Sequence, residues 1–439
     1  MDKIEQARVA VANYDYIRFA VCDINGTSRG PAMHRRYAEK YLLGGLDLYE
    51  EILLFGYNNE IVILPHDKEY HNGNATLVPD LDTLRPIPWA GENTFKVAEI
   101  LCESRWKKDL SPQAACPRYV ARQQLKQLDD LGFQLYSGFE IEYFLFDANT
   151  LTPVFPGKSF LCQQTLNKCG KYVYKFDNQL KQSGIDVEKM HLEYAPGMFE
   201  AALEPKYGIE GVDAAFNLKQ GLLELADQND LKASFMSKLD ADLSGAGCHY
   251  SLSILAKDTG ENAFYDVSST DNLSPMAKQW IAGILKHSKA LAALTSPTIN
   301  CYRRLHQPWA PGGIYWNIED RATSLRVKNH GPSGTYLENR MPSGRSNPYL
   351  VMAATIAAGL DGVRNKLVCP PPGNLKDADL LPKSLPEALK DLKDDSYMVS
   401  ALGQEMISWF LKCKEVDIEQ FKYIEDDKER FSYERKVYF

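Results

Sequence analysis

The segment Gly138–Phe146 (GFEIEYFLF) places two glutamates inside an otherwise apolar run with the composition of a β-strand. Because side chains alternate between the two faces of a strand, Glu140 and Glu142 project from the same face. Either this face is open and both carboxylates are solvated, or it is internal and cations lie between them, since buried like charges repel strongly. The position of the strand in the fold decides between these two interpretations.

The 439-residue chain has the composition of a globular protein, with 44% hydrophobic and 25% charged residues. At about 150 residues per domain, its length predicts two or three domains. Acidic residues outnumber basic ones, 58 to 50, which gives a formal net charge of −8. Because there is no basic surplus to release counterions, a nucleic acid is not expected as the main partner.

No segment predicts a membrane span, because the longest apolar runs, such as Leu350–Leu360, fall well short of the ~20 residues required. The start, MDKIEQARVA, lacks the basic head and apolar stretch of a secretory signal, so export is not expected. Nine scattered cysteines without a Cys-x-x-Cys pair indicate neither a disulfide framework nor a zinc site. These features favour a cytoplasmic protein with no membrane partner.

Residues 1–105 have the pattern of strands and turns, with strands expected at Tyr16–Asp23 and Glu60–Leu64. Two prolines in Ser111–Arg118 interrupt the pattern before a helical stretch, Tyr119–Leu131, and the strand Phe133–Phe146. We therefore expect a small N-terminal sheet domain, residues 1–110, and a larger domain, residues 111–439.

Strands alternate with helices in the larger domain, which predicts an α/β or α+β architecture. The helices are expected at Val212–Gln228, Pro275–Leu294, Pro348–Val363 and Leu385–Lys412.

Two further segments place candidate ligands close together. Glu193 and Glu200 are separated by Pro196 and Gly197, which allow a tight bend that brings both carboxylates to one point. In Ser244–His249 (SGAGCH), two glycines let the backbone pass close to a ligand just before a histidine. Each signal alone is weak, because a lone histidine or glutamate pair usually has a structural role.

Glu338 and Arg340 lie two apart on an expected strand, so their opposite charges share a face, where they form either a plain salt bridge or part of a site. Three more arginines, Arg304, Arg321 and Arg326, gather upstream. Clustered guanidinium groups suit bidentate capture of carboxylate or phosphoryl oxygens.

Taken in order, these motifs resemble the glutamine synthetase superfamily from about residue 15 to the C-terminus. The series is Glu-x-Glu, Glu-x6-Glu, Gly-x-Gly-x-His, Tyr-x-Arg, Arg-x4-Arg, Glu-x-Arg and Asn-Pro-Tyr-Leu. Within the superfamily, the chain resembles the class I-like branch that contains γ-glutamyl-polyamine (γ-glutamyl-amine) synthetases and the eye-lens protein lengsin. The resemblance implies an α+β fold with a β-grasp N-terminal domain and a glutamine synthetase/guanido kinase-like catalytic domain, built on a barrel-like antiparallel sheet with flanking helices.

The same resemblance implies a site for two divalent cations, Mg²⁺ or Mn²⁺, and for ATP. Glu142, Glu193 and Glu200 would hold one ion, and Glu140, His249 and Glu338 the other. The implied catalytic residues are Arg304, Arg321, Arg326 and Arg340. The implied substrate-binding residues are Ser244, Gly245, Arg304, Trp309 and Arg340, and the implied nucleotide-binding residues are Ser251, Arg321, Arg326 and Tyr336. The chemistry is phosphoryl transfer from ATP to the γ-carboxylate of glutamate, followed by attack of an amine on the acyl phosphate.

Departures from the family pattern bear on which amine is the acceptor substrate. The ammonia-using enzymes carry a Glu-Ala-Pro loop, where this chain has Trp309–Pro311 (WAP), and an Asp-Gly-Ser-Ser segment, where it has Leu53–Glu60 (LLFGYNNE). Loss of both acidic groups favours an amine larger than ammonia, with Trp309 either lining its pocket through cation–π contact or only packing the loop. Three further departures, which put substrate affinity or identity in doubt, are Met198, Ser244 and Tyr336.

Three functions follow as hypotheses. The first is a γ-glutamyl-amine synthetase, an ATP-dependent ligase that joins glutamate to a primary amine. The second is a non-catalytic structural oligomer similar to lengsin. The third is an ammonia-dependent glutamine synthetase in which Glu319, Asp320 or Glu60 replaces the missing anion. By resemblance, the protein is expected to be a homo-oligomer, a dodecamer of two stacked hexameric rings.

Overall fold

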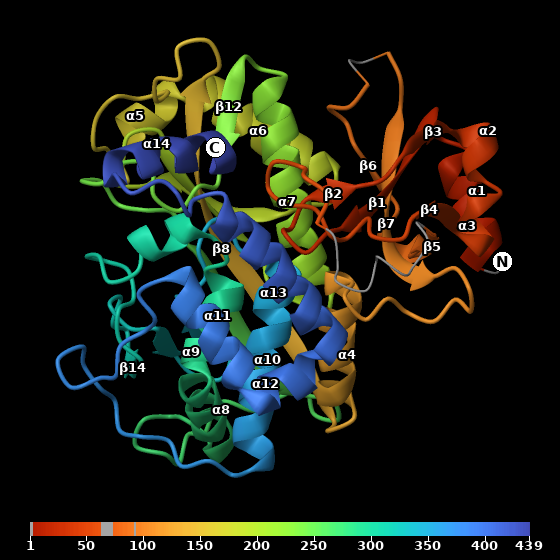
Figure 1. Cartoon of the computed structure of the whole chain (residues 1–439). Helices are drawn as coiled ribbons and strands as arrows, with labels where there is room; N and C mark the ends of the chain where they lie inside the picture. Colours follow the sequence, from red (N-terminus) through yellow and green to blue (C-terminus); the bar gives the residue numbers. More distant parts are fainter. Residues whose placement is uncertain (1–2, 63–72, 92–93) are drawn as a thin grey trace.

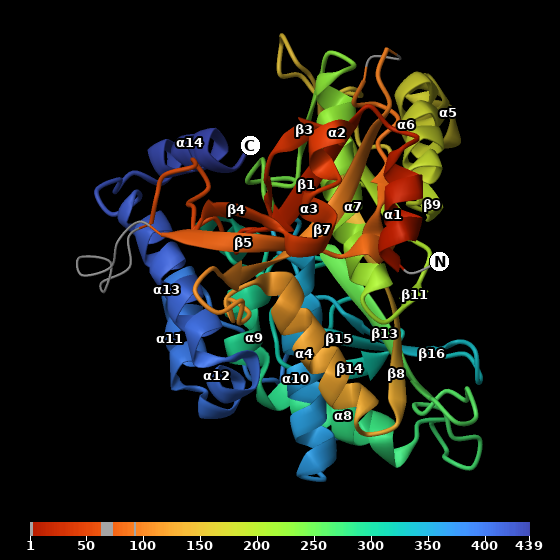
Figure 2. The ribbon, with the colours of Figure 1, turned by 90° about the vertical axis from the view of Figure 1, so that its right-hand side faces the viewer.

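The computed structural model describes residues 3–62, 73–91 and 94–439, and its strands form two sheets (Figures 1 and 2). The strands are β1 (Tyr16–Cys22), β2 (Ser28–Arg29), β3 (Ala32–His34), β4 (Leu46–Tyr49), β5 (Asn74–Pro79), β6 (Arg85–Pro86), β7 (Val97–Trp106), β8 (Phe133–Asp147), β9 (Val187–Leu192), β10 (Met198–Leu203), β11 (Lys206–Tyr207), β12 (Leu231–Ser234), β13 (Cys248–Ala256), β14 (Trp316–Ile318), β15 (Leu325–Asn329) and β16 (Thr335–Asn339). The helices are α1 (Lys3–Val11), α2 (Arg35–Ala38), α3 (Tyr41–Gly44), α4 (Pro117–Asp129), α5 (Gln163–Lys168), α6 (Gly170–Gln182), α7 (Glu210–Asp227), α8 (Pro275–Lys286), α9 (Ser288–Thr295), α10 (Pro348–Arg364), α11 (Leu385–Asp394), α12 (Ser396–Leu402), α13 (Gln404–Glu419) and α14 (Asp427–Tyr438), with short 3₁₀ helices η2 (Leu81–Thr83) and η3 (Ile299–Arg303).

The first sheet has seven strands, which all lie between Tyr16 and Trp106. Its main order is β2-β1-β7-β5-β4, with β1 and β7 parallel and the other pairs antiparallel. The expected strand at Tyr16–Asp23 is present as β1. The strand expected at Glu60–Leu64 is not formed over its described part, where Ile61 makes only an isolated bridge to Phe55, and its last two residues lie outside the described residues.

The second sheet has nine strands in the main order β14-β15-β16-β13-β8-β10-β9, and every pair except β14–β15 is antiparallel. The 15-residue strand β8 lies between β13 and β10 and also pairs with β11 and β12. The predicted strand at Phe133–Phe146 is therefore the central strand of the larger sheet. The mixed α and β content of this part of the chain agrees with the expected fold class.

One face of this sheet is apolar and packs against helices. Phe139 and Ile141 of β8 and Tyr250 of β13 are almost completely buried, and the rings of Phe139 and Tyr250 lie 4.6 Å apart. Helices α4 and α7 contact β8, and α10 contacts both of these helices (Figure 1). Because side chains alternate along β8, residues Glu140 and Glu142 must lie on the opposite face of the same strand.

Two long predicted helices are interrupted in the structure. The helix expected over Pro275–Leu294 is divided into α8 and α9 at His287, and the helix expected over Leu385–Lys412 is divided into α11, α12 and α13. The last break falls at Gly403, whose φ of 94° is outside the helical region and is tolerated by glycine. The helix α1, which begins a region expected to contain only strands and turns, was not predicted. No helix of the described residues is long and apolar enough to cross a membrane.

The break at His287 is held by two carboxylates. The buried imidazole contacts Asp395 through Nδ1 at 2.6 Å and Asp361 through Nε2 at 3.0 Å. Asp361 lies in α10, and Asp395 is the N-cap residue of α12, so the three residues join separate helices. The imidazole faces a carboxylate on each side, and both contacts are strongest when its two nitrogens are protonated and both acids are ionised.

This arrangement predicts a loss of stability in acid. Burial opposes ionisation of Asp395, but the hydrogen bond from His287 prevails and lowers its pKa, so the stabilisation is present above the unfolded pKa of about 3.9 and is lost as the pH falls through the lower folded pKa. At pH 6, Asp395→Asn should lower the free energy of unfolding by about 2 kcal/mol, the usual scale for a charged hydrogen bond. Urea unfolding should show this difference shrinking towards pH 3; a difference that grows in acid would contradict the assignment.

Candidate active site

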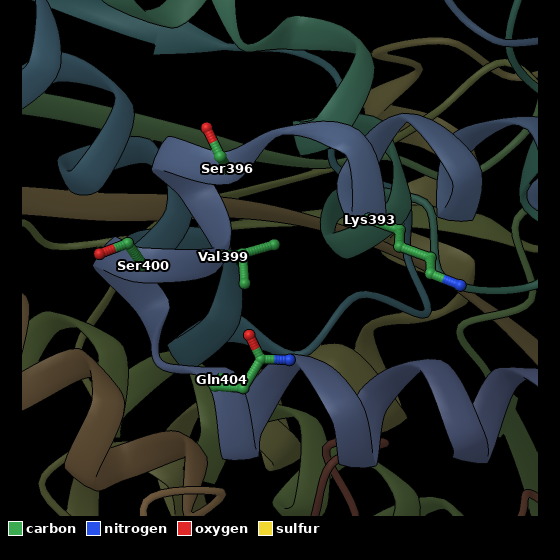
Figure 3. A pocket seen from close by; sticks show the side chains of 5 residues that line it. All are labelled: Lys393, Ser396, Val399, Ser400 and Gln404. Atoms are coloured by element: carbon green, nitrogen blue, oxygen red, sulfur yellow. The ribbon is translucent and has the colours of Figure 1, made fainter.

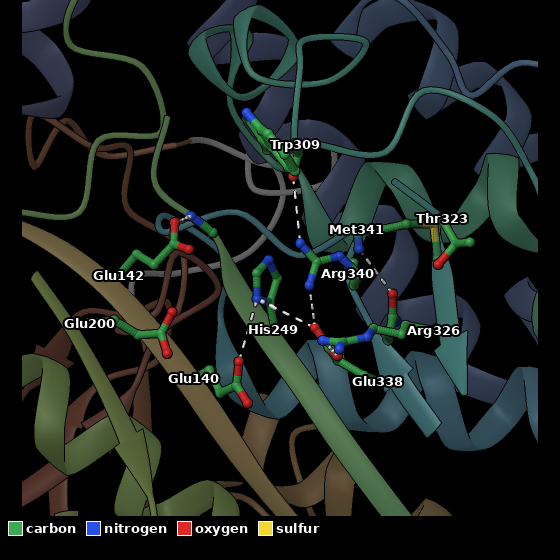
Figure 4. Close-up of polar contacts among 12 residues, drawn as sticks. Glu140, Glu142, Glu200, His249, Trp309, Thr323, Arg326, Glu338, Arg340 and Met341 are labelled. Atoms are coloured by element: carbon green, nitrogen blue, oxygen red, sulfur yellow. Dashed lines mark hydrogen bonds and ion pairs between the residues drawn. The ribbon is translucent and has the colours of Figure 1, made fainter. Parts of the chain in front are cut away.

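The charged face of the nine-stranded sheet brings together residues from six strands. The register places Glu142 opposite Glu200, which in turn lies opposite His191. In the next rows, Glu140 lies opposite His249, and Glu338 lies opposite both Ser251 and Arg326. Figure 4 shows the side chains of Glu140, His249 and Glu338 directed towards one another. Residues that are up to about two hundred positions apart in the sequence therefore share one surface.

The first cluster consists of Glu140, His249 and Glu338, whose ligand atoms all lie within 4.8 Å of one another. His249 Nδ1 is 3.8 Å from Glu140 Oε2 and 3.7 Å from Glu338 Oε1 (Figure 4). These distances are too long for hydrogen bonds, and the buried Nδ1 has no hydrogen-bond partner. An unpartnered buried nitrogen between two carboxylates is the arrangement expected where a cation completes the set.

The charges near Glu140 keep it ionised. Burial alone would raise the pKa of this carboxyl, but His249, together with Lys189 and Arg340, holds it at about 2. Glu140 therefore carries its negative charge throughout the physiological range.

The second cluster consists of His191, Glu193 and Glu200. His191 Nε2 lies 3.1 Å from Glu200 Oε1, and His191 Nδ1 lies 3.6 Å from Glu193 Oε1. Burial, followed by repulsion from Glu142 and Glu200, raises the pKa of Glu193 to about 8. The carboxylates are therefore close enough that one of them retains a proton when no cation balances them.

This second cluster differs from the expected set in two residues. His191 was not predicted as a site residue, although it lies two positions before Glu193. Glu142 is not within the 4.8 Å group, and its Oε2 accepts a hydrogen bond from the backbone N–H of Gly247 at 2.5 Å. Glu142 nevertheless faces Glu200 across the β8–β10 pair.

The two glycines of Ser244–His249 allow a close approach by a buried arginine. A Cβ atom at Gly247 would lie 2.7 Å from Arg304 Nη2 and 2.8 Å from His249 Nε2, and one at Gly245 would lie 3.2 Å from the Arg304 side chain. The sequence predicted that these glycines let the backbone pass close to a ligand, which stays a prediction. In the structure they also leave room for the Arg304 guanidinium beside the histidine.

Three of the four predicted arginines lie at the charged face. Arg304 Nη2 is 3.3 Å from His249 Nε2, and Arg326 Nη1 donates to Glu338 Oε2 at 3.1 Å. Arg340 donates to the other oxygen of Glu338 (Figure 4). All three guanidinium groups are buried, and Nε of both Arg326 and Arg340 has no partner. Buried N–H groups in excess of their acceptors suit the binding of an anion.

The other predicted residues are placed less uniformly. Arg321 is exposed on the turn before β15, and no described hydrogen bond or ion pair joins it to the clusters. Ser251 and Tyr336 lie on the charged face, next to His249 and Glu338 along their strands. Burial, with Glu140 and Glu338 nearby, raises the pKa of Tyr336 to about 12. Ser244 Oγ lies 3.9 Å from the sulfur of Met198, so these two departures from the family pattern touch each other.

Trp309 lies at the edge of the site with its side chain in solvent. It is 75% exposed, its φ is 68°, and its carbonyl oxygen is 3.5 Å from Arg340 Nη2 (Figure 4). An indole this exposed does not pack the loop within its own chain. The backbone of the loop is therefore tied to the site, while the ring is free to contact another molecule.

The residues considered as replacements for the missing anion differ in how far they are engaged. Glu319 pairs with Arg326, Lys328 and His330. Glu60 Oε1 accepts a hydrogen bond from Gln420, while its buried Oε2 has no hydrogen-bond partner, and Asp320 Oδ1 accepts one from the backbone N–H of Ala322. Of these three acids, Glu319 is the one with both carboxylate oxygens in ion pairs.

A separate hollow lies among α11, α12 and α13 (Figure 3). It is lined by Lys393, Ser396, Val399, Ser400 and Gln404, which include no carboxylate, histidine or cysteine. The charged face of the nine-stranded sheet is therefore the better candidate for a catalytic site.

Comparison with known proteins identifies the family. The glutamine synthetase catalytic domain matches residues 114–433. Lengsin of Canis lupus familiaris is 31% identical over 440 residues, covering 95% of this chain and 73% of that protein. Glutamine synthetase of Thermotoga maritima is 30% identical over 430 residues, covering 93% of this chain and 94% of the relative. The chain belongs to the glutamine synthetase family.

Solved structures agree at the level of the fold. The crystal structure of a novel glutamine synthase homolog superposes with a TM-score of 0.86 at 23% identity and covers 97% of this chain and 99% of that chain. A complex of GmaS with ADP superposes with a TM-score of 0.83 at 24% identity and covers 97% of this chain and 98% of that chain. The family-level resemblance expected from the motifs is thus confirmed, and the family is that of ATP-dependent ligases that use divalent metals.

Proposed function

We propose that this chain is a γ-glutamyl-amine synthetase, which activates the γ-carboxylate of glutamate with ATP and joins it to a primary amine. The observation that carries the proposal is the collection of five carboxylates on one face, Glu140, Glu142, Glu193, Glu200 and Glu338, with three buried arginines beside them. So much buried charge is costly unless ligands bind it.

The residues present fit two divalent cations. Glu140, His249 and Glu338 would hold one, since the unpartnered His249 Nδ1 lies between two carboxylates. Glu193 and Glu200 would hold the other, with Glu142 across the strand pair and His191 beside them. Oxygen-rich ligand sets with an imidazole suit Mg²⁺ or Mn²⁺, which when bound supply charge neutralisation at the phosphoryl and carboxylate oxygens.

The chain's own residues then have separable tasks. Ser251, Arg326 and Tyr336 lie beside the first cluster, where they would orient the nucleotide phosphates; Arg321, which belongs to the same predicted set, would have to turn inward. Arg304 and Arg340 are buried next to His249 and Glu338, where they would bind the glutamate carboxylate and stabilise the transferring phosphoryl group. The amine nitrogen then forms a bond to the acyl carbon, and phosphate leaves. That a GmaS of the same fold forms a complex with ADP supports an adenine nucleotide as the ligand.

The acceptor is proposed to be an amine larger than ammonia. No acidic side chain replaces the acidic gate at Trp309–Pro311, and one of the three acids considered as substitutes, Glu319, has both carboxylate oxygens in ion pairs with basic side chains. The exposed Trp309 ring supports contact with a cationic or aromatic amine.

A panel of acceptors tests this choice. ADP release should be measured with glutamate, Mg²⁺ or Mn²⁺, and ammonia, polyamines, aromatic monoamines or ethanolamine. Turnover with ammonia alone would indicate a glutamine synthetase, and no ADP with any acceptor would favour a structural oligomer similar to lengsin. We expect turnover with at least one amine that far exceeds turnover with ammonia.

Two substitutions at Trp309 sharpen the test. Trp309→Ala should raise the KM for the preferred amine about 10-fold, the scale of one desolvated cation–π contact, and leave the KM for glutamate nearly unchanged. Trp309→Glu should increase the use of ammonia, because it restores a carboxylate to the loop. Equal changes in both KM values would indicate that the loop, rather than the indole ring, was disturbed.

Three further expectations accompany the proposal. A homo-oligomer of twelve chains in two stacked hexameric rings and a cytoplasmic location stay predictions from the family resemblance, as do the two domains at residues 1–110 and 111–439. Native mass spectrometry tests the first of these directly.

A further inference from the structure

Glu319 lies at the centre of a group of basic side chains. Its Oε2 is 2.8 Å from Lys328 Nζ and 2.5 Å from Arg326 Nη2, and its Oε1 is 2.6 Å from His330 Nε2. One carboxylate therefore engages three basic side chains. Arrangements of this kind bind carboxylate and phosphate oxygens equally well, because both anions present several acceptors to converging donors.

These basic residues continue the charged face of the sheet. Arg326 and Lys328 lie two apart on β15, so their side chains share a face, and they lie opposite Glu338 and Tyr336 of β16. Arg326 bridges the two acids, because its Nη1 donates to Glu338 while its Nη2 donates to Glu319 (the Glu338 contact is seen in Figure 4). The Glu319 group is thus contiguous with the Glu140–His249–Glu338 cluster.

Glu319 itself is placed so that it can be displaced. It precedes β15 on a turn, its φ is 56°, and its side chain is 35% exposed, whereas the Arg326 side chain is only 8% exposed. A released carboxylate would be hydrated by solvent, which offsets part of the loss of its three ion pairs. Its release would leave Lys328 and one edge of Arg326 open towards the charged face.

We propose that Glu319 is an internal competitor, which occupies Arg326, Lys328 and His330 and is displaced when the phosphate groups of the nucleotide bind there. This inference rests on the proposed function, since it requires nucleotide phosphates at this end of the charged face. It assigns Lys328 and His330 to a polyphosphate-binding surface that no motif indicated, and it makes Glu319 a determinant of nucleotide affinity.

Calorimetric titration tests the proposal with two probes, ADP in the presence of Mg²⁺ and inorganic tripolyphosphate. Glu319→Gln should bind both probes about 10-fold more tightly than the unaltered protein, because the neutral amide no longer competes for the cations. Lys328→Gln should bind both more weakly by a similar factor. Glu261→Gln removes the same charge from an exposed position with no described ion pair, so it should leave both affinities unchanged.

Equal or weaker binding by Glu319→Gln would overturn the inference, because it would show that the carboxylate orients the basic residues rather than occupies them. The proposed function would still hold if Glu319→Gln failed this test while the unaltered protein bound ADP and Lys328→Gln bound it more weakly. If neither the unaltered protein nor Glu319→Gln binds either probe, both proposals fail. Thermal unfolding of each variant serves as a control, because a lowered melting temperature would show that a change in affinity reflects damage to the fold.

Discussion

Replacement of Glu338 by glutamine should lower ADP release at least about 10³-fold, which corresponds to roughly 4 kcal/mol of lost transition-state stabilisation. The carboxylate lies between His249, Arg326 and Arg340, and it is 1% exposed. Glutamine keeps the volume and one acceptor for the arginines, so the fold should survive, whereas alanine would leave the buried Arg340 without this acid and Arg326 with Glu319 alone. Steady-state ADP release and circular dichroism separate the two effects.

A matched control is available on the same sheet. Glu188 lies on β9, where it is exposed and belongs to neither acidic cluster. Glu188→Gln should therefore retain full activity. If Glu338→Gln also retains full activity while remaining folded, then the first metal cluster has no part in the reaction.

Replacement of Arg118 by methionine should lower the free energy of unfolding by about 3 to 5 kcal/mol, the usual cost of breaking a buried charge network. Arg118 is 1% exposed and donates to both oxygens of Asp213 at 2.9 and 2.8 Å. It also contacts Asp80 and Glu103, which belong to the segment that forms the first sheet. Methionine would leave Asp213 buried with only the Tyr349 hydroxyl as a partner among these groups.

Arg118 links the first sheet to α7, so urea unfolding of this variant should also separate into two transitions. Tryptophan fluorescence and far-ultraviolet circular dichroism would detect them. Lys126→Met on the same helix is the control, since the Lys126–Asp130 pair is exposed and such pairs contribute about 0.5 kcal/mol or less. If both variants lost a similar free energy of unfolding, the buried network would contribute no more to stability than an exposed ion pair.

The sequence was most informative where charged residues lie two positions apart on an expected strand. Glu140 and Glu142 in an apolar strand, and Glu338 followed by Arg340, predicted shared faces without any knowledge of the fold. Pairing of these strands places Glu140 opposite His249, a residue that the family resemblance assigns to the same ion. The convergence itself was predicted by family resemblance, because long-range strand order cannot be derived from local patterns.

The features that sequence reasoning missed depend on tertiary contacts. His191 lies two positions before Glu193, but only the β9–β10 register brings it to Glu200. The helix breaks at His287 and Asp395 arise because two carboxylates and an imidazole from separate helices meet there. The close approach of Arg304 to Gly247 likewise joins segments that are distant in the chain.

The two acidic clusters are expected to bind a pair of divalent cations. Manganese binding should be measured by electron paramagnetic resonance on the full chain and on Glu338→Gln and Glu193→Gln. We expect two Mn²⁺ ions per chain at millimolar supply and the loss of one ion in each variant. Failure of the unaltered chain to bind any Mn²⁺ under these conditions, or retention of both ions in both variants, would contradict this expectation.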